Sequence, residues 1–85
     1  MTFYTYMMRN HKGDNTAEGD LADDMYLDKK KFPRNSSCKF KGWHDLIKDY
    51  LHRQGACSEC VSVFEKCWRE YETNERKRLG MRLIT

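Results

Sequence analysis

The chain has 85 residues, 39% of them hydrophobic, and a formal net charge of +3 at pH 7. This length accommodates one small domain and excludes a multidomain enzyme, and the low apolar content predicts a thin core. No apolar run approaches the roughly 20 residues that cross a bilayer, and the N-terminus lacks the cationic start and long apolar stretch of a secretory signal. We therefore expect a cytoplasmic protein whose four cysteines are thiols or metal ligands rather than disulfides.

Apolar residues at helical spacing predict two short helices near the N-terminus, over residues 3–11 and 16–27. The residues that form their apolar faces lie three or four positions apart: Phe3, Tyr6, Met7, Leu21, Ala22, Met25 and Tyr26. Thr2 is the expected N-cap of the first helix. Asn15, followed three residues later by Glu18, is the expected capping box of the second.

Two further helices are predicted in the second half of the chain. Their apolar stripes are formed by Trp43, Leu46, Ile47, Tyr50 and Leu51, and by Cys60, Phe64, Cys67 and Tyr71. The first of these helices ends at Gly55, in the C-cap position, and the second begins near Ser58 and is expected to extend toward Gly80. The large aromatic residues at helical spacing are expected to form the core rather than a base-stacking platform.

Glycine and proline mark the breaks between these elements. Gly19 weakens the second helix by about 1 kcal/mol relative to alanine, and Pro33 interrupts the helical pattern over residues 28–42. No strand pattern of period two is present. We therefore predict an all-α fold, a compact bundle of four or five short helices, with residues 1–73 forming the domain and residues 74–85 a basic tail or a helix extension.

The order of these elements resembles the YozE SAM-like family, small helical proteins of Gram-positive bacteria and their mobile elements. The matching motifs are Phe3-Tyr4-x-Tyr6-Met7, Leu21-Ala22-x-x-Met25-x-x-Asp28, Phe32-Pro33, Asp49-Tyr50-Leu51 and Val63-Phe64-x-x-Cys67-Trp68-x-x-Tyr71. The resemblance covers about residues 3 to 71 and implies a fold like a sterile alpha motif, but it implies no activity and no site. The four cysteines, a longer loop over residues 34–42 and the basic tail depart from the family's pattern.

Positive charge is concentrated in residues 29–41 and in the tail. The basic residues that form this candidate binding patch are Lys29, Lys30, Lys31, Arg34, Lys39, Lys41, Arg76, Lys77, Arg78 and Arg82. Such a patch is suited to phosphate contacts with DNA or RNA, with Phe40 or Trp43 able to stack on bases. The alternative is a solvated surface that keeps a small protein soluble, and we favour it over direct nucleic-acid binding.

Cys57 and Cys60 have the two-residue spacing found in zinc sites, and His52 and Cys38 are candidates to complete a tetrahedral set. A second pair of ligands at characteristic spacing is missing, and Cys60 also falls on an apolar stripe, as does Cys67. We therefore predict no bound metal or other cofactor, and keep these four residues as a weak zinc candidate.

No catalytic constellation is recognised. His44 and Asp45 have no nucleophile at a characteristic spacing, and His11 near the end of a helix is a favourable placement for a cation that requires no chemistry. We therefore expect a non-enzymatic binding module that acts through protein–protein contacts and does not bind a membrane. Its small size and the distribution of the family suggest an accessory or inhibitory protein of a phage or mobile element, which targets a complex that handles nucleic acid. The alternative is sequence-independent nucleic-acid binding through residues 29–41 and the tail.

Overall fold

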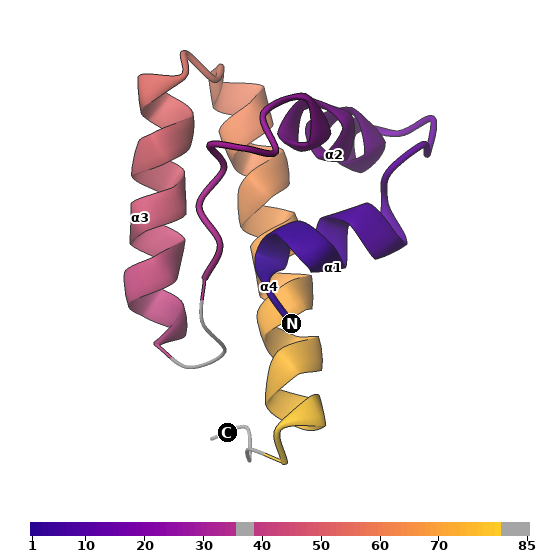
Figure 1. Cartoon of the computed structure of the whole chain (residues 1–85), viewed down its shortest axis with the longest axis vertical. Coiled ribbons are helices and arrows are strands. Elements are labelled where there is room, and N and C mark those ends of the chain that lie inside the picture. Colours follow the sequence, from indigo (N-terminus) through magenta and orange to yellow (C-terminus); the bar gives the residue numbers. More distant parts are fainter. Residues whose placement is uncertain (36–38, 81–85) are drawn as a thin grey trace.

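The computed structural model describes residues 1–35 and 39–80. It contains four helices, α1 (Phe3–Asn10), α2 (Ala17–Leu27), α3 (Phe40–Arg53) and α4 (Ser58–Arg78). The described residues contain no strand, so the predicted all-α bundle is confirmed. Figure 1 shows α4 running along the molecule, with α1 and α2 on one side of it and α3 on the other.

The longest helix, α4, organises the bundle. Within the described part of the chain, α1, α2 and α3 each contact α4, and α1 also contacts α2, whereas α2 and α3 make no backbone contact with each other. The apolar stripe of α4 explains this arrangement, because Phe64, Cys67, Trp68 and Tyr71 are all buried. The separation of α2 from α3 leaves a space above α4 that is lined by side chains.

Aromatic side chains make up much of the core. The ring of Phe3 lies 5.5 Å from that of Phe64, 5.1 Å from that of Trp68 and 5.5 Å from that of Tyr71, measured between centroids. Edge-to-face and tilted pairs at such distances are favourable beyond the area that they bury. The predicted core is confirmed for most of its aromatic residues, but Tyr50 and Trp43 are only partly buried.

The caps of the first two helices are both threonines. Thr2 is the N-cap of α1, as predicted, and its hydroxyl accepts a hydrogen bond from the N–H of Thr5 at 3.1 Å. The predicted capping box at Asn15 is wrong, because the N-cap of α2 is Thr16, whose hydroxyl accepts from the N–H of Gly19 at 3.0 Å. Asn and Thr are both good N-cap residues, and either side chain can accept a hydrogen bond from the first free N–H groups of the helix. Because Asn15 and Thr16 are adjacent, the sequence alone does not decide which of them caps α2.

The presence of glycine at position 19, which helix propensity disfavours, is explained by the packing around it. It is buried, and a Cβ at this position would lie 2.0 Å from the carbonyl oxygen of Asp14. The loop between α1 and α2 therefore folds back onto the first turn of α2 only because residue 19 has no side chain.

Helix α3 begins at Phe40, three residues before the predicted start of its apolar stripe. Lys39 precedes it in the left-handed conformation, at φ 73°, and Phe40 is buried against the ring of Tyr71. Because Phe40 is buried in the core, α3 begins within the segment that was predicted to be a loop. The end of α3 lies within one residue of the prediction: the C-cap is Gln54, and Gly55 follows it with a φ of +81° and an N–H that donates to the carbonyl of His52 at 3.0 Å.

Helix α4 continues past its aromatic stripe to Arg78, so residues 74–78 extend the helix, which is one of the two alternatives predicted for them. Glu75, in this last part, is one of two buried polar or charged side chains in the described residues; the other is Asn35. Its carboxylate pairs with Arg78 at 2.8 Å and with the amino group of Met1 at 3.0 Å. No helix among the described residues combines the length and apolar character needed to cross a membrane.

Candidate functional site

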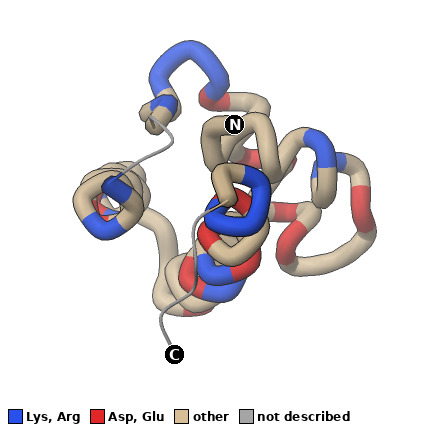
Figure 2. Tube along the Cα trace, turned by 90° about the horizontal axis from the view of Figure 1, so that it is seen from below, with Lys and Arg blue, Asp and Glu red and all other residues tan. Residues whose placement is uncertain are grey.

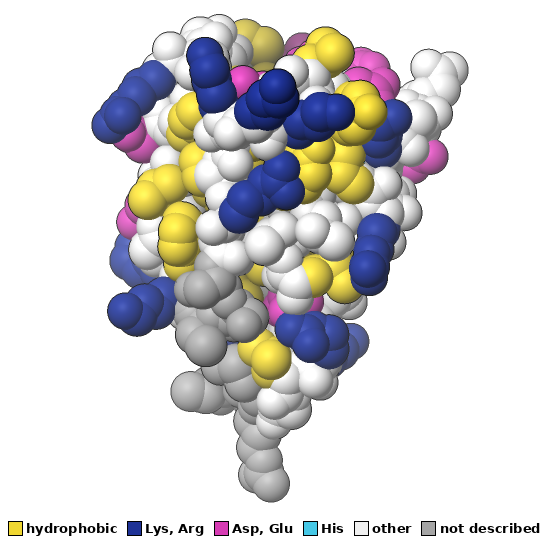
Figure 3. Space-filling view, in the orientation of Figure 1, with side chains coloured by type: hydrophobic (Ala, Val, Ile, Leu, Met, Phe, Trp, Pro, Cys, Tyr) yellow, Lys and Arg dark blue, Asp and Glu magenta, His cyan; other side chains and the backbone are white. Residues whose placement is uncertain are grey.

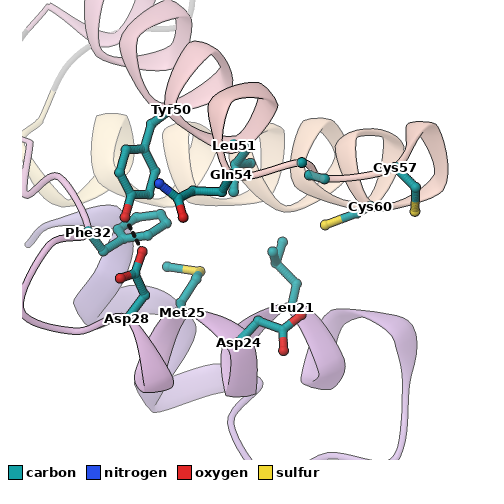
Figure 4. A pocket seen from close by; sticks show the side chains of 12 residues that line it. Leu21, Asp24, Met25, Asp28, Phe32, Tyr50, Leu51, Gln54, Cys57 and Cys60 are labelled. Atoms are coloured by element: carbon teal, nitrogen blue, oxygen red, sulfur yellow. Dashed lines mark hydrogen bonds between the residues drawn. The ribbon is translucent and has the colours of Figure 1, made fainter.

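The space between α2 and α3 is a groove with a volume of about 380 Å³. One wall is the face of α2 formed by residues at helical spacing, Leu21, Asp24 and Met25, which Asp28 continues just beyond the helix end. Figure 4 shows these side chains on one side of the space, opposite residues of α3 and of the turn that leads into α4. The groove thus exists because α2 and α3 both pack on α4 rather than on each other.

The opposite wall and the two ends of the groove come from later parts of the chain. The remaining lining residues are Phe32, Tyr50, Leu51, Gln54, Gly55, Ala56, Cys57 and Cys60. Phe32 and Tyr50 lie at one end, with ring centroids 5.6 Å apart, and Cys57 and Cys60 lie at the other (Figure 4). The walls are therefore largely apolar, although they are formed by four separate segments.

The polar part of the groove is acidic. A second hollow of about 240 Å³ continues the groove, sharing Leu21, Asp24 and both cysteines with it and adding Asp20 and Glu59. Together the two hollows are bordered by four carboxylates, and none of the described residues that line them is Lys, Arg or His. The groove consequently combines an apolar floor with a uniformly negative border.

One hydrogen bond closes the aromatic end of the groove. The hydroxyl of Tyr50 donates to the carboxylate of Asp28, which ties α3 to the end of α2 (Figure 4). Burial, and after it the hydrogen bond to Asp28, raises the pKa of the Tyr50 hydroxyl to about 12. Tyr50 is therefore a neutral donor that holds a carboxylate at the border of an apolar space.

The basic residues predicted to form one patch are divided between two ends of the linker that joins α2 to α3. Lys29, Lys30 and Lys31 follow directly after α2, whereas Lys39 and Lys41 lie at the start of α3. In Figure 1 these are opposite ends of the linker, and Figure 2 shows the first group as one uninterrupted blue arc. The structure therefore does not bring the ten predicted residues together, and Arg82 lies outside the described residues.

The positive charges at the end of α4 are largely neutralised within the helix. Arg76 pairs with Glu72 at 2.9 Å, and Arg78 pairs with Glu75 at 2.8 Å. Figure 2 accordingly shows blue and red segments alternating along this helix. Residues 76–78 therefore do not form an isolated cationic tail.

Three basic side chains lie on tyrosine rings, two from the linker between α2 and α3 and one from the loop between α1 and α2. The guanidinium of Arg34 is 3.6 Å from the ring centroid of Tyr4, and the ammonium groups of Lys12 and Lys29 are 4.4 and 4.6 Å from that of Tyr26. Figure 3 shows Lys and Arg side chains spread over this face with apolar side chains between them. The prediction that Phe40 is available for stacking is wrong, because Phe40 is 5% exposed and lies beneath Arg76.

The three predicted zinc ligands that the structure describes, Cys57, Cys60 and His52, are not gathered into one site. Cys57 is exposed and Cys60 half-buried, both facing the groove, while His52 is exposed and does not line it. Cys38 lies outside the described residues. Burial raises the pKa of the Cys60 thiol, so the free thiol is protonated at neutral pH.

A different trio of metal-binding side chains does converge. Among residues 1–35 and 39–80, the group whose ligand atoms all lie within 4.8 Å of one another is His11, Cys67 and Glu70. Sequence spacing could not reveal it, because His11 is 56 positions from Cys67 in the chain. Only the i, i+3 spacing of Cys67 and Glu70 on one helix was visible in the sequence.

His44, noted in the sequence for its neighbour Asp45, forms part of a polar link between α3 and α4. Its Nε2 lies 2.6 Å from the carboxylate of Glu65 and its Nδ1 lies 2.8 Å from that of Asp45. The ring also stacks on Phe64, with centroids 5.4 Å apart. These contacts fix the orientation of the imidazole and join two helices.

Comparison with known proteins supports the fold. The sequence model of the YozE SAM-like fold matches residues 2–73, while no curated protein and no solved structure matches the chain. The matched residues include α1, α2, α3 and most of α4, which are the helices that form the groove and the aromatic core. Since the match covers most of the chain, and the four-helix bundle agrees with it, this protein belongs to the YozE SAM-like family.

Proposed function

We propose that this protein is a non-catalytic binding module that acts through protein–protein contacts, with the groove between α2 and α3 as its docking site. The observation that carries the proposal is the composition of the groove, which has apolar walls bordered by Asp20, Asp24, Asp28 and Glu59. Its larger hollow, about 380 Å³, falls within the range of roughly 300–1,000 Å³ typical of ligand sites. The second hollow lengthens it, which suits an elongated segment better than a small molecule.

The occupant that fits this groove is a short amphipathic helix of a partner protein, apolar on one side and carrying Lys or Arg at its borders. Apolar side chains would bury their surface against Leu21, Met25 and Leu51. The basic side chains would meet the carboxylates around the groove, which speeds encounter and disfavours acidic partners. The complementarity of charge therefore selects the class of partner.

Two synthetic helical peptides test this proposal, one built from Leu and Lys and the other from Leu and Glu with the same pattern. The Leu/Lys peptide is expected to shift the backbone amide resonances of α2, α3 and residues 55–60, and the Leu/Glu peptide is expected to leave them unchanged. Equal shifts with both peptides, or shifts confined to other helices, would contradict the proposal.

A matched pair of charge reversals sharpens the test. Asp24→Lys changes a carboxylate at the groove, and Asp49→Lys changes an exposed carboxylate of α3 that does not line it. The two variants have the same net charge, so a loss of Leu/Lys peptide binding in Asp24→Lys alone assigns the effect to the groove. Equal losses in both variants would show that only the overall charge matters.

The distribution of the family supports a more specific setting for this activity. We infer a role in the cytoplasm as an accessory or inhibitory protein of a phage or other mobile element. The partner would belong to a complex that handles nucleic acid, since such complexes contain basic segments of the kind that the groove accommodates.

Direct, sequence-independent nucleic-acid binding is the second candidate function. It is favoured by the cluster of Lys12, Lys29 and the half-exposed ring of Tyr26 beside the arc Lys29–Lys31. Cationic side chains next to an exposed ring are typical of surfaces that bind phosphate groups and stack on bases. The end of α4 contributes little to this surface, because Arg76 and Arg78 are paired with carboxylates of their own helix.

A further inference from the structure

His11 is the starting point of a second site, on the far side of α4 from α3. It is the C-cap of α1, and its Nε2 is buried without a hydrogen-bond partner in the described structure. Its Nδ1 faces the carboxylate of Asp14 at 4.0 Å. A buried ring nitrogen without a partner is costly, so this atom calls for a specific explanation.

The side chains that face His11 come from α4. Cys67 is fully buried and Glu70, one turn later, is exposed. A ring nitrogen of His11, the sulfur of Cys67 and a carboxylate oxygen of Glu70 all lie within 4.8 Å of one another. Because Nδ1 is directed toward Asp14, Nε2 is the nitrogen available to this group.

We propose that His11, Cys67 and Glu70 bind a divalent transition-metal ion of the zinc class, which links the end of α1 to the middle of α4. One nitrogen, one sulfur and one oxygen form a borderline-soft donor set that favours Zn²⁺ or Co²⁺ over Ca²⁺ or Mg²⁺. The thiolate and the carboxylate together balance the charge of the ion. A fourth position remains for water.

The distances require only a small adjustment. Around a tetrahedral ion with bonds of about 2.0–2.3 Å, ligand atoms are separated by roughly 3.3–3.8 Å. Glu70 is on the surface and can change its rotamer freely, so the group closes by a movement of about 1 Å. Asp14 behind Nδ1 occupies the place of the outer carboxylate that commonly orients a metal-binding histidine.

The surrounding charges are compatible with a cation. Lys66, which directly precedes Cys67 on α4, forms an ion pair with the carboxylate of Glu18 at 2.8 Å. Burial raises the pKa of the Cys67 thiol to about 12, with the negative charge of Glu70 adding to the effect. The ion must therefore displace the thiol proton, and a coordinated thiol is deprotonated outright. Glu70 also borders a shallow surface hollow with Arg69, Thr73 and Asn74, which gives the site access to solvent.

Titration of the full chain with Co²⁺ tests the proposal, because a bound thiolate gives an intense ligand-to-metal charge-transfer band. The wild type is expected to bind one Co²⁺ per chain with this band, and Zn²⁺ is expected to displace it. Cys67→Ala should remove the band, while His11→Gln and Glu70→Gln should weaken Co²⁺ affinity by about tenfold or more. The His11 and Glu70 variants keep the buried cysteine, so they remain informative even where Cys67→Ala impairs folding.

The matched control is the double variant Cys57→Ser/Cys60→Ser, which removes the thiols at the groove and leaves the proposed ligands in place. It is expected to bind Co²⁺ like the wild type. Absence of a charge-transfer band in the wild type would overturn the proposal. So would a band that survives in Cys67→Ala and disappears in the control, since the metal would then lie at the cysteines of the groove.

Discussion

The side chain of Asn35 completes the first turn of α1, because its Oδ1 accepts a hydrogen bond from the N–H of Phe3 at 2.7 Å. On its other side, the Nδ2 of Asn35 donates to the hydroxyl of Tyr71 at 2.7 Å. One buried carboxamide in the linker thus joins a helix N-terminus to the centre of α4. The first N–H groups of a helix have no partner within the helix itself.

Replacement of Asn35 by alanine is expected to lower the free energy of unfolding by about 2–3 kcal/mol, because it leaves a buried N–H and a buried hydroxyl without this partner. Urea denaturation measures the change. Asn74→Ala is the matched control, since its side chain is exposed and only a 3.4 Å hydrogen bond joins it to Tyr6. Equal losses in the two variants would show that the carboxamide of Asn35 has no special role.

Alanine substitutions at two helical glycines are expected to have opposite effects. Gly19→Ala places a Cβ 2.0 Å from the carbonyl oxygen of Asp14, so the loop must move and the protein is destabilised despite the better helix propensity of alanine. Gly42→Ala meets no atom within 4 Å and should stabilise the protein by about 0.5–1 kcal/mol. Thermal unfolding of the two variants distinguishes these outcomes by the direction of the change in Tm.

Glu75 predicts a loss of stability in acid. The hydrogen bond from Arg78, followed by that from the N-terminal amino group, lowers the pKa of the Glu75 carboxyl despite its burial. A carboxyl with a lowered folded-state pKa binds fewer protons than in the unfolded chain, so its contribution is complete above about pH 4.3 and is lost as the pH falls through the folded-state value. The free energies of unfolding of the wild type and of Glu75→Gln should therefore differ most near neutral pH and become equal in acid. A difference that is independent of pH would contradict this assignment.

Tyr50 predicts a delayed ionisation at high pH. Its pKa of about 12 results first from burial and then from the hydrogen bond to Asp28. In a spectrophotometric titration, Asp28→Asn should lower this value without restoring the ordinary value of about 10, because burial, the larger cause, is unchanged. The raised value stabilises the folded state up to about pH 10, and this contribution is lost as the pH rises toward the folded-state value. Complete restoration of the ordinary value would show that Asp28 is the main cause.

Reversal of charge in the linker separates the two candidate functions. Replacing Lys29, Lys30 and Lys31 with glutamate should abolish any binding of single- or double-stranded nucleic acid and its dependence on salt. Binding of the Leu/Lys peptide in the groove should be retained or strengthened by the same change. Fluorescence anisotropy at two salt concentrations measures both. Nucleic-acid binding by the wild type that is unaffected in this variant would exclude the linker as its site.

Most of the fold was predictable because it depends on local patterns. The apolar stripe that contains Phe64 and Tyr71 predicts α4, and Gly55 predicts the end of α3, since both signals lie within a few residues. The early start of α3 was missed because it depends on the burial of Phe40 against a residue 31 positions later in the chain. Long-range burial of this kind overrides local turn signals.

The candidate sites were much less predictable. The acidic residues of α2 can be read from the sequence. That Asp24 and Asp28 face a groove cannot, because the groove depends on the packing of α2 and α3 on a third helix. Charge counting likewise identified Arg76 and Arg78 but not their pairing with acidic neighbours one turn away. The convergence of His11 with Cys67 had no signal in their spacing at all.

The central place of α4 also determines the order in which this protein can fold during synthesis. The three earlier helices all pack against α4, the last of the four to be made, and the buried apolar stripe of α4 extends to Tyr71. A nascent chain that stops before Tyr71 therefore has amphipathic helices but no core to hold them. Folding of this bundle must wait until α4 has left the ribosome as far as Tyr71, and until then the apolar faces of α1, α2 and α3 remain open to chaperones.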